Sequence, residues 1–191
     1  MPEPEITVLE ALHSTPARRY LSPQPIGDDI VRKLLDAAIR GPNGGNDEFI
    51  ELFNPCTSPV DLSNWALIYR SAMGVSDVTV AQLANGQRIA ANGYLLIAGP
   101  AYVGSGAAAP DQVYNAGRLA AAGGGLELRD VVPAAVDSVG WGSATNAFVE
   151  GAVAPAPPAG QSIARTPNGS DSNHNDTDFA VATTPTPKAS N

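Results

Sequence analysis

One acidic stretch in the C-terminal third of the chain carries oxygen-bearing side chains at alternate positions, the spacing of calcium-binding loops. It runs Asp171-Ser172-Asn173-His174-Asn175-Asp176-Thr177-Asp178. The candidate ligands for Ca²⁺ are Asp171, Asn173, Asn175 and Asp178. The stretch departs from the EF-hand pattern, because Asp176 stands where a Gly is needed and Ala182 where the bidentate Glu belongs. A calcium site and a loop of Asx turns both stay open.

The other side chains that could carry chemistry are few. His13 and His174 both lie beside polar turn residues and are too few for Ser-His-Asp catalysis or a His-rich metal site. Cys56 is the single cysteine, so it forms no internal disulfide and offers a metal only one thiolate. The run Gly123-Gly124-Gly125 lacks the spacing of a phosphate loop and predicts a turn before a strand. These residues do not indicate an enzyme.

Composition favours short strands over a helical bundle. The 191 residues allow one ordinary domain with an extension, and the 19 Gly, 17 Pro and 16% charged residues are typical of a turn-rich β protein. The net charge is −8 and the bases after residue 46 are scattered, whereas phosphate binding needs clustered cations. We therefore expect no nucleic-acid partner, and no run approaches the ~20 apolar residues that membrane insertion needs.

The first 46 residues follow a helical period. Between Asp28 and Arg40 apolar residues recur at spacings of three and four, which predicts an amphipathic helix ending at Gly41 and Pro42. A shorter helix is expected from Ile6 to His13, although Ile6–Leu9 also fits an edge strand.

After Asn46 the pattern changes to short apolar runs bounded by Gly, Asn, Asp and Pro, which predicts a β-sandwich. The alternation in Leu126-Glu127-Leu128-Arg129 points the leucines inward. The expected strands are Glu48–Phe53, Trp65–Arg70, Tyr94–Ala98, Gly125–Arg129, Val136–Trp141, Ser162–Arg165 and Phe179–Ala182. The expected core residues are Ile50, Leu52, Trp65, Leu67, Leu95, Ile97, Leu126 and Leu128.

Four segments of the β part carry a further pattern, namely Asp47–Asn54, Pro59–Trp65, Val136–Gly140, and Asp178–Phe179 with Thr184–Pro187. In order and spacing these segments resemble the bacterial lamin tail domain family. The resemblance covers about residues 47–191 and implies an immunoglobulin-like β-sandwich. It also implies a non-catalytic module, whose bacterial relatives are carried by exported or cell-surface proteins. Such domains normally begin with a strand upstream of their Gly- and Asn-rich turn, where this chain has a helical pattern.

The first 46 residues resemble the opening of the FMN-dependent nitroreductase family, through residues 12–20 and 34–46. In that family a basic residue matching Arg18 reaches the flavin phosphate and an Asn matching Asn46 approaches the flavin ring. Pro16 stands where the family often has a phosphate-binding Ser. The later elements of the family are missing, so the resemblance implies a truncated fragment whose flavin pocket does not close. The chain has the form of a chimera joined within residues 41–46.

The sequence thus predicts a mainly β fold, an immunoglobulin-like β-sandwich with an N-terminal α-helical extension. The expected parts are a nitroreductase-like helical fragment over 1–46, a lamin-tail-like domain over 47–184 and a disordered tail over 185–191. The expected function is non-catalytic binding of an unknown protein or surface ligand, without a cofactor. The alternatives are an FMN-dependent oxidoreductase, inactive through truncation, and a calcium-stabilised extracellular module. The β part resembles exported proteins, while the missing signal peptide favours the cytoplasm for the chain as it stands.

Overall fold

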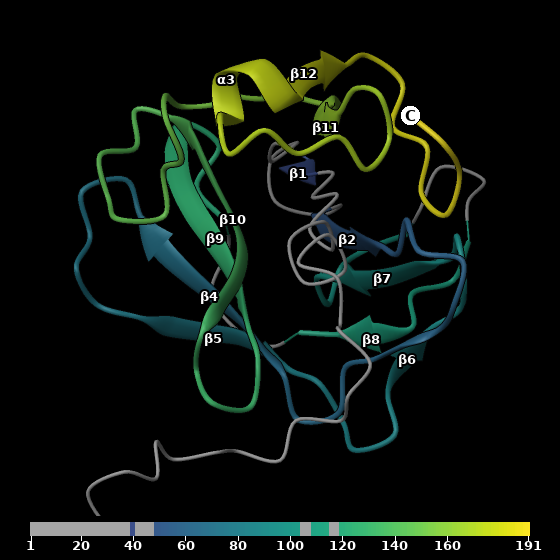
Figure 1. Ribbon diagram of the computed structural model, residues 1–191. Coiled ribbons are helices and arrows are strands. Elements are labelled where there is room, and N and C mark those ends of the chain that lie inside the picture. Colours follow the sequence, from purple (N-terminus) through teal and green to yellow (C-terminus); the bar gives the residue numbers. More distant parts are fainter. Residues whose placement is uncertain (1–38, 41–47, 104–107, 115–118) are drawn as a thin grey trace, which may run out of the picture.

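Two main β-sheets face each other across one apolar core (Figure 1). The computed structural model describes residues 39–40, 48–103, 108–114 and 119–191. One sheet has four antiparallel strands in the order β10-β9-β4-β5. The other has the order β2-β7-β8, with β2 antiparallel and β8 parallel to β7. The described residues are therefore mainly β and form a sandwich, as the sequence predicted.

The elements are numbered in chain order and group into sheets as follows. The four-stranded sheet contains β4 (Ala66–Ser71), β5 (Val78–Gln82), β9 (Gly123–Arg129) and β10 (Ala135–Gly142). The facing sheet contains β2 (Phe49–Phe53), β7 (Tyr94–Ala98) and β8 (Gln112–Val113). A third, smaller sheet places β11 (Ser162–Arg165) between β1 (Ile39–Arg40) and β12 (Phe179–Ala182). The remaining elements are the pair β3 (Val60–Asp61) and β6 (Arg88–Ile89), and the one-turn helix α3 (Asn175–Asp178).

Every strand expected from the sequence is present, with ends that move by at most two residues. The strands that the sequence analysis missed are β1, β3, β5, β6 and β8. Four of these have only two residues, too few for a period of alternation, and tertiary pairing alone defines them. In β5 the alternation is broken, because Val80 and Ala81 are both buried and the partner strand β4 shifts register between Leu67 and Ile68.

The expectation of a helix reaching Arg40 is wrong at its end. Ile39 and Arg40 form β1, in which Ile39 is paired with Ile163 and Arg40 with Ser162 of β11. Pairing with β11 outweighs the local helical pattern there. This short strand lies just before the Gly- and Asn-rich residues 41–46, at the place where the lamin-tail resemblance implied a strand. The rest of the N-terminal helical extension, the helix Ile6–His13 and its strand alternative Ile6–Leu9 lie outside the described residues.

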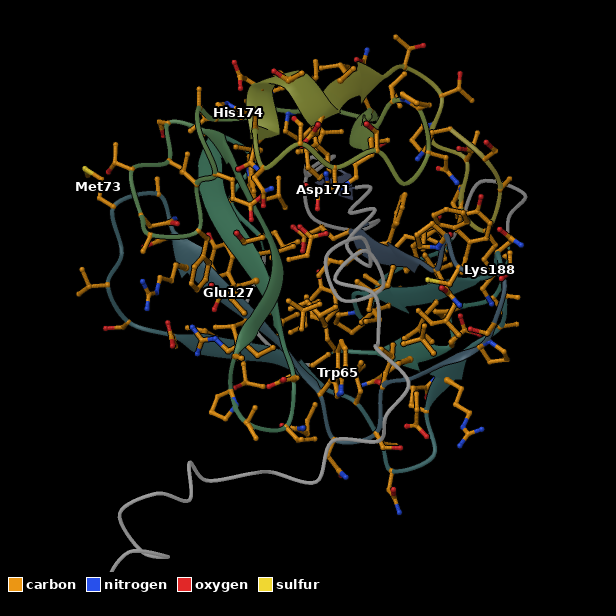
Figure 2. The ribbon with its side chains drawn as sticks, in the orientation of Figure 1. Trp65, Met73, Glu127, Asp171, His174 and Lys188 are labelled. Atoms are coloured by element: carbon orange, nitrogen blue, oxygen red, sulfur yellow. The ribbon has the colours of Figure 1, made fainter. Side chains whose placement is uncertain are left out.

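The core lies between the inward faces of both sheets. Its buried residues include Ile50, Leu52, Leu67, Leu95, Ile97, Leu126 and Leu128, as predicted. The largest of them is Trp141, which is 0% exposed and donates its indole N–H to the Ala120 carbonyl at 2.9 Å. Trp65, expected inside the core, is only partly buried and packs against its margin. Figure 2 shows Trp65 at the lower end of the space between the sheets.

Glycines of β9 let large groups cover both faces of that strand. A Cβ on Gly124 would lie 2.8 Å from the rings of Trp141 and Tyr69 on the inner face. A Cβ on Gly125 would lie 2.9 Å from Cβ of Phe148, which covers the outer face. Residues 123–125, for which the sequence predicted a turn, are therefore strand residues, and their lack of side chains makes room for the aromatic rings.

The two tryptophans should differ in their contribution to stability. We expect Trp141→Ala to lower the free energy of unfolding by about 3–5 kcal/mol, because it empties a fully buried aromatic site. Trp65→Ala is the matched control and should cost less, since part of that ring already contacts solvent. Chemical denaturation of both variants measures the difference. Equal losses, or a larger loss for Trp65→Ala, would contradict the described core.

Candidate cation site around Arg165

Arg165, the last residue of β11, is buried at the junction of three elements, with 0% of its side chain exposed. One guanidinium nitrogen, Nη2, donates to Asp137 of β10 at 2.8 Å. The other, Nη1, lies 3.2 Å from Asp178 of α3 and 3.3 Å from Asp171. Nη1 also donates to the Ser170 carbonyl at 2.7 Å, and the guanidinium lies 4.6 Å from the centre of the Phe179 ring.

The neighbouring acids keep the buried guanidinium of Arg165 in its charged form. Burial alone would lower the pKa of the guanidinium, but Asp137, Asp171 and Asp178 outweigh it, so the pKa is raised. A buried cation of this kind needs hydrogen-bonded anions around it. Arg165 therefore fastens the loop before α3, and α3 itself, to β10.

The four calcium ligands predicted from sequence do not converge as a set. Asp171 and Asp178 meet at Arg165, and their side chains are 4% and 2% exposed. Asn173 is exposed, with a φ of 57°, and its N–H donates to Asp171 in an Asx turn. Asn175 is buried and uses its amide within the fold. Figure 2 shows Asp171 below α3, with His174 at the outer surface.

Asn175 joins α3 to the neighbouring strand and loop. Its Oδ1 accepts the N–H groups of Gly140 and Glu150, at 2.8 and 3.0 Å. Its Nδ2 donates to the Ser138 carbonyl at 3.1 Å and to Glu150 at 3.2 Å. These bonds use both polar atoms of the amide. Asn175 therefore organises the site without facing its centre.

A different set of carboxylates does converge. Asp137, Glu150 and Asp171 each offer an oxygen, and the three oxygens lie within 4.8 Å of one another. Together with Asp178, four carboxylates here face the single guanidinium of Arg165. Burial first, and then the charge of Asp171, raise the pKa of Glu150. Carboxylate oxygens at this spacing suit a hard cation such as Ca²⁺, whose charge would offset the excess of acids.

Sequence reasoning found two members of this site and missed three. Asp137, Glu150 and Arg165 come from β10, from the segment after it and from β11. A signal was present, since Asp137 and Arg165 both stand inside expected strands, where a charged residue is buried only if it is paired. The other predicted site residues, Arg18 and Asn46 of the flavin hypothesis, lie outside the described residues, as does His13. Cys56 is a free, partly buried thiol.

The arrangement of two sheets around one core defines this part of the chain as a β-sandwich of the immunoglobulin-like type. The family model described as Lamin Tail Domain matches residues 35–143. The chain therefore belongs to the lamin tail domain family, and the match includes β1, ahead of the expected boundary at residue 47. No curated protein matches the chain, and nothing in the comparisons supports the nitroreductase resemblance of residues 1–46.

The family match ends before most of the Arg165 site. Asp137 lies within residues 35–143, whereas Glu150, Arg165, Asp171 and Asp178 lie beyond them. The site thus joins the matched sheet to the segment that follows it. Among the residues that the structure describes, no helix has the length and apolar character needed to cross a membrane.

Removing the cation at the centre should be costly. We expect Arg165→Met to lower the free energy of unfolding by about 3–5 kcal/mol, because it leaves buried carboxylates without their partner. Arg88→Met is the control, since the pair of Arg88 with Asp61 is exposed and its loss should change stability little. Urea denaturation at neutral pH gives both values. A small effect of Arg165→Met would show that the carboxylates are not held by its charge.

Glu150 should give stability a pH dependence of known sign. Its pKa is raised in the folded state, so the folded chain holds a proton that the unfolded chain has already released. Its contribution to stability is therefore present below the unfolded value, near 4.5, and is lost as pH rises through the folded value. We expect Glu150→Gln to remove this loss, which unfolding curves from pH 4 to pH 8 would show. Parallel pH profiles of the two proteins would contradict it.

Proposed function

We propose that this chain is a non-catalytic binding or structural module of the lamin-tail type, which mediates a protein or cell-surface interaction. Membership of the lamin tail domain family supports the module. The observation that carries the proposal is the use of the buried charges. Arg165 and Asp178, both in the interior, are engaged in fixing loops and α3 to the sandwich. Because these buried groups bond within the fold, a partner would have to be bound by residues on the surface.

The surface offers apolar side chains for such contacts. In the loop between β4 and β5, Met73 is 83% and Val75 is 85% exposed. Figure 2 shows Met73 at the outer margin of the molecule. At the turn between β9 and β10, Val131 and Val132 are also exposed, and Asp130 fixes that turn by accepting two main-chain N–H groups. Exposed apolar side chains that lie together in this way favour contact with a partner.

Retention on cell envelopes tests this proposal. We expect a fluorescent fusion of the full chain to bind envelopes, or an array of exported proteins, in a saturable way. The fluorescent partner alone is the control and should bind only in proportion to its concentration. A second control is the Arg165→Met fusion, which separates binding by the folded domain from binding by the rest of the chain. Retention that never saturates, on envelopes and on the array, would contradict a binding role.

The oxidoreductase alternative stays a proposal that rests on the resemblance of residues 12–20 and 34–46, with Arg18 and Asn46 as the flavin contacts. A flavin site needs a pocket that buries most of the ligand. The buried apolar residues described after residue 46 pack in the core of the sandwich and are not arranged to line such a pocket. FMN affinity should be no better than about millimolar, or about −4 kcal/mol. The purified protein should therefore be colourless. Stoichiometric FMN in its visible spectrum would restore the oxidoreductase.

A second candidate function is that of a calcium-stabilised extracellular module. It is favoured by the convergence of Asp137, Glu150 and Asp171, in place of the alternate ligands predicted from Asp171 to Asp178. The cation would lie beside Arg165, between β10 and the loop before α3. Its charge would be opposed by the guanidinium and drawn by four carboxylates.

Calcium should then raise the melting temperature. Ligand at 100 times its dissociation constant stabilises a protein by about 2.7 kcal/mol, so a site of about 50 µM affinity would respond clearly at 5 mM Ca²⁺. We expect Glu150→Gln to reduce the response, while Asp61→Asn, an acid in an exposed pair, leaves it unchanged. Differential scanning calorimetry with Ca²⁺ or EDTA measures it. An unchanged melting temperature would remove the calcium candidate.

A further inference from the structure

The turn between β5 and β6 carries an exposed Asn-Gly pair, Asn85 and Gly86. The Gln87 N–H closes this turn by donating to the Ala84 carbonyl at 3.1 Å. Gly86 has a φ of 84°, and no atom lies within 4 Å of the position that its Cβ would take. The side-chain amide of Asn85 bonds to none of the residues that the structure describes. In Figure 1 the turn comes just before β6, at the lower right.

The Gly86 N–H begins a chain of hydrogen bonds that ends at a carboxylate. It donates to Ser63 Oγ at 2.9 Å, and the Ser63 hydroxyl donates in turn to Asp61 Oδ1. The Ser63 N–H also donates to Asp61 Oδ1, at 2.9 Å, which fixes the serine beside the acid. Pairing of β3 with β6 brings the two segments together, because Asp61 is paired with Arg88. A hydroxyl backed by a carboxylate is able to take a proton from a nucleophile.

The carboxylate of Asp61 is ionised and faces the serine. Hydrogen bonds from Ser63, and then the charge of Arg88, hold the pKa of the Asp61 carboxyl below its usual range. Asp61 therefore carries no proton of its own at neutral pH. Its two oxygens have separate partners, since Arg88 Nη2 donates to Oδ2 at 2.9 Å and Ser63 uses Oδ1.

We propose that Asn85 is a self-modifying residue, which loses its amide nitrogen through attack by the Gly86 main-chain nitrogen, with Ser63 and Asp61 as the proton relay. The Gly86 nitrogen gives its proton to Ser63 Oγ as the serine proton passes to Asp61, and it forms a bond to Cγ of Asn85. The bond from Cγ to Nδ2 then breaks, and the leaving nitrogen takes the proton back and departs as ammonia. Water opens the resulting cyclic imide at either carbonyl, so residue 85 becomes an aspartate or an iso-aspartate.

The relay and the electrophile do not compete for the Gly86 nitrogen. The N–H of a peptide group lies in the plane of that group, whereas the nitrogen attacks through electrons perpendicular to the plane. Ser63 therefore takes the proton from one direction while Cγ of Asn85 approaches from another. The ring closes without obstruction, because Gly86 has no side chain and its backbone is conformationally permissive.

The modification changes the surface of the β5–β6 turn. One neutral amide becomes one carboxylate, so the net charge moves from −8 to −9. The iso-aspartate product also adds a methylene group to the main chain of the turn. These changes occur near the exposed pair of Asp61 with Arg88. The inference is independent of the proposed binding function.

Two other Asn-Gly pairs among the described residues serve as internal controls. Asn92 is exposed in a turn, but the Gly93 N–H donates to a main-chain carbonyl at 3.0 Å, and a carbonyl does not pass a proton on. Asn168 is partly buried, and its amide nitrogen donates to the Tyr94 hydroxyl at 2.8 Å. We therefore expect Asn85 to react faster than Asn92 and Asn168 in the same folded chain.

Incubation of the folded full chain at neutral pH, followed by peptide mass mapping, measures the reaction. The Asn85→Asp variant supplies a reference peptide that distinguishes the aspartate product from the iso-aspartate. We expect Ser63→Ala and Asp61→Asn to slow the reaction at residue 85 by at least about tenfold, because a positioned proton acceptor contributes about 100- to 10,000-fold. Arg88→Met is the matched control. It removes the exposed ion pair but keeps the relay, so it should not slow the reaction.

The sign of the effect separates a proton relay from a structural clamp. If Ser63 only held the Gly86 N–H in the turn, its removal would loosen the turn and the reaction would become faster. An equal or faster reaction in Ser63→Ala and Asp61→Asn would overturn the proposal, and so would reaction at Asn92 as fast as at Asn85. Circular dichroism and melting establish the fold of each variant. Asp61→Asn, which keeps an oxygen for Ser63, decides the matter if Ser63→Ala does not fold.

Discussion

The structure depends on one buried cation. Arg165 has no exposed side-chain surface and contacts acids from β10, from the loop before α3 and from α3 itself. A guanidinium with its planar, forked donors suits this position, because one nitrogen reaches Asp137 while the other reaches Asp171, Asp178 and a carbonyl. Without that charge the acids would be left in the interior, where an unpaired carboxylate is costly.

Contacts around Arg165 position the segment that follows residue 143. Glu150 accepts hydrogen bonds from Ser138 and Asn175, and Asn175 binds the main chain of β10. In the same segment, Phe148 covers the outer face of β9 over Gly125, and the Arg70 guanidinium lies 4.5 Å from the centre of its ring. The glycines of β9 and β10 and the buried cation therefore have the same effect. Both allow the segment after β10 to pack closely on the sheet.

Much of the fold could be predicted from the sequence, because the long strands carry local signals. Leu126 and Leu128 alternate with Glu127 and Arg129, and the apolar run Tyr94–Ala98 marked a central strand. Two-residue strands such as β3 carry no such signal, and Ile39–Arg40 carried the opposite one. The candidate site was predictable only in part. Asp171 and Asp178 are local to one loop, whereas Asp137, Glu150 and Arg165 are brought together by the pairing of distant strands.

A double-mutant cycle between Arg165 and Asp137 tests the central claim most directly. Their contact, at 2.8 Å between fully buried groups, joins β11 to β10 across the site. If the cation holds the surrounding acids in place, Asp137→Leu should cost much less in the Arg165→Met background than in the wild type, with a coupling free energy of about 1–3 kcal/mol. Costs that simply add, with coupling near zero, would show that Arg165 and Asp137 contribute independently and that the fold does not depend on their pairing.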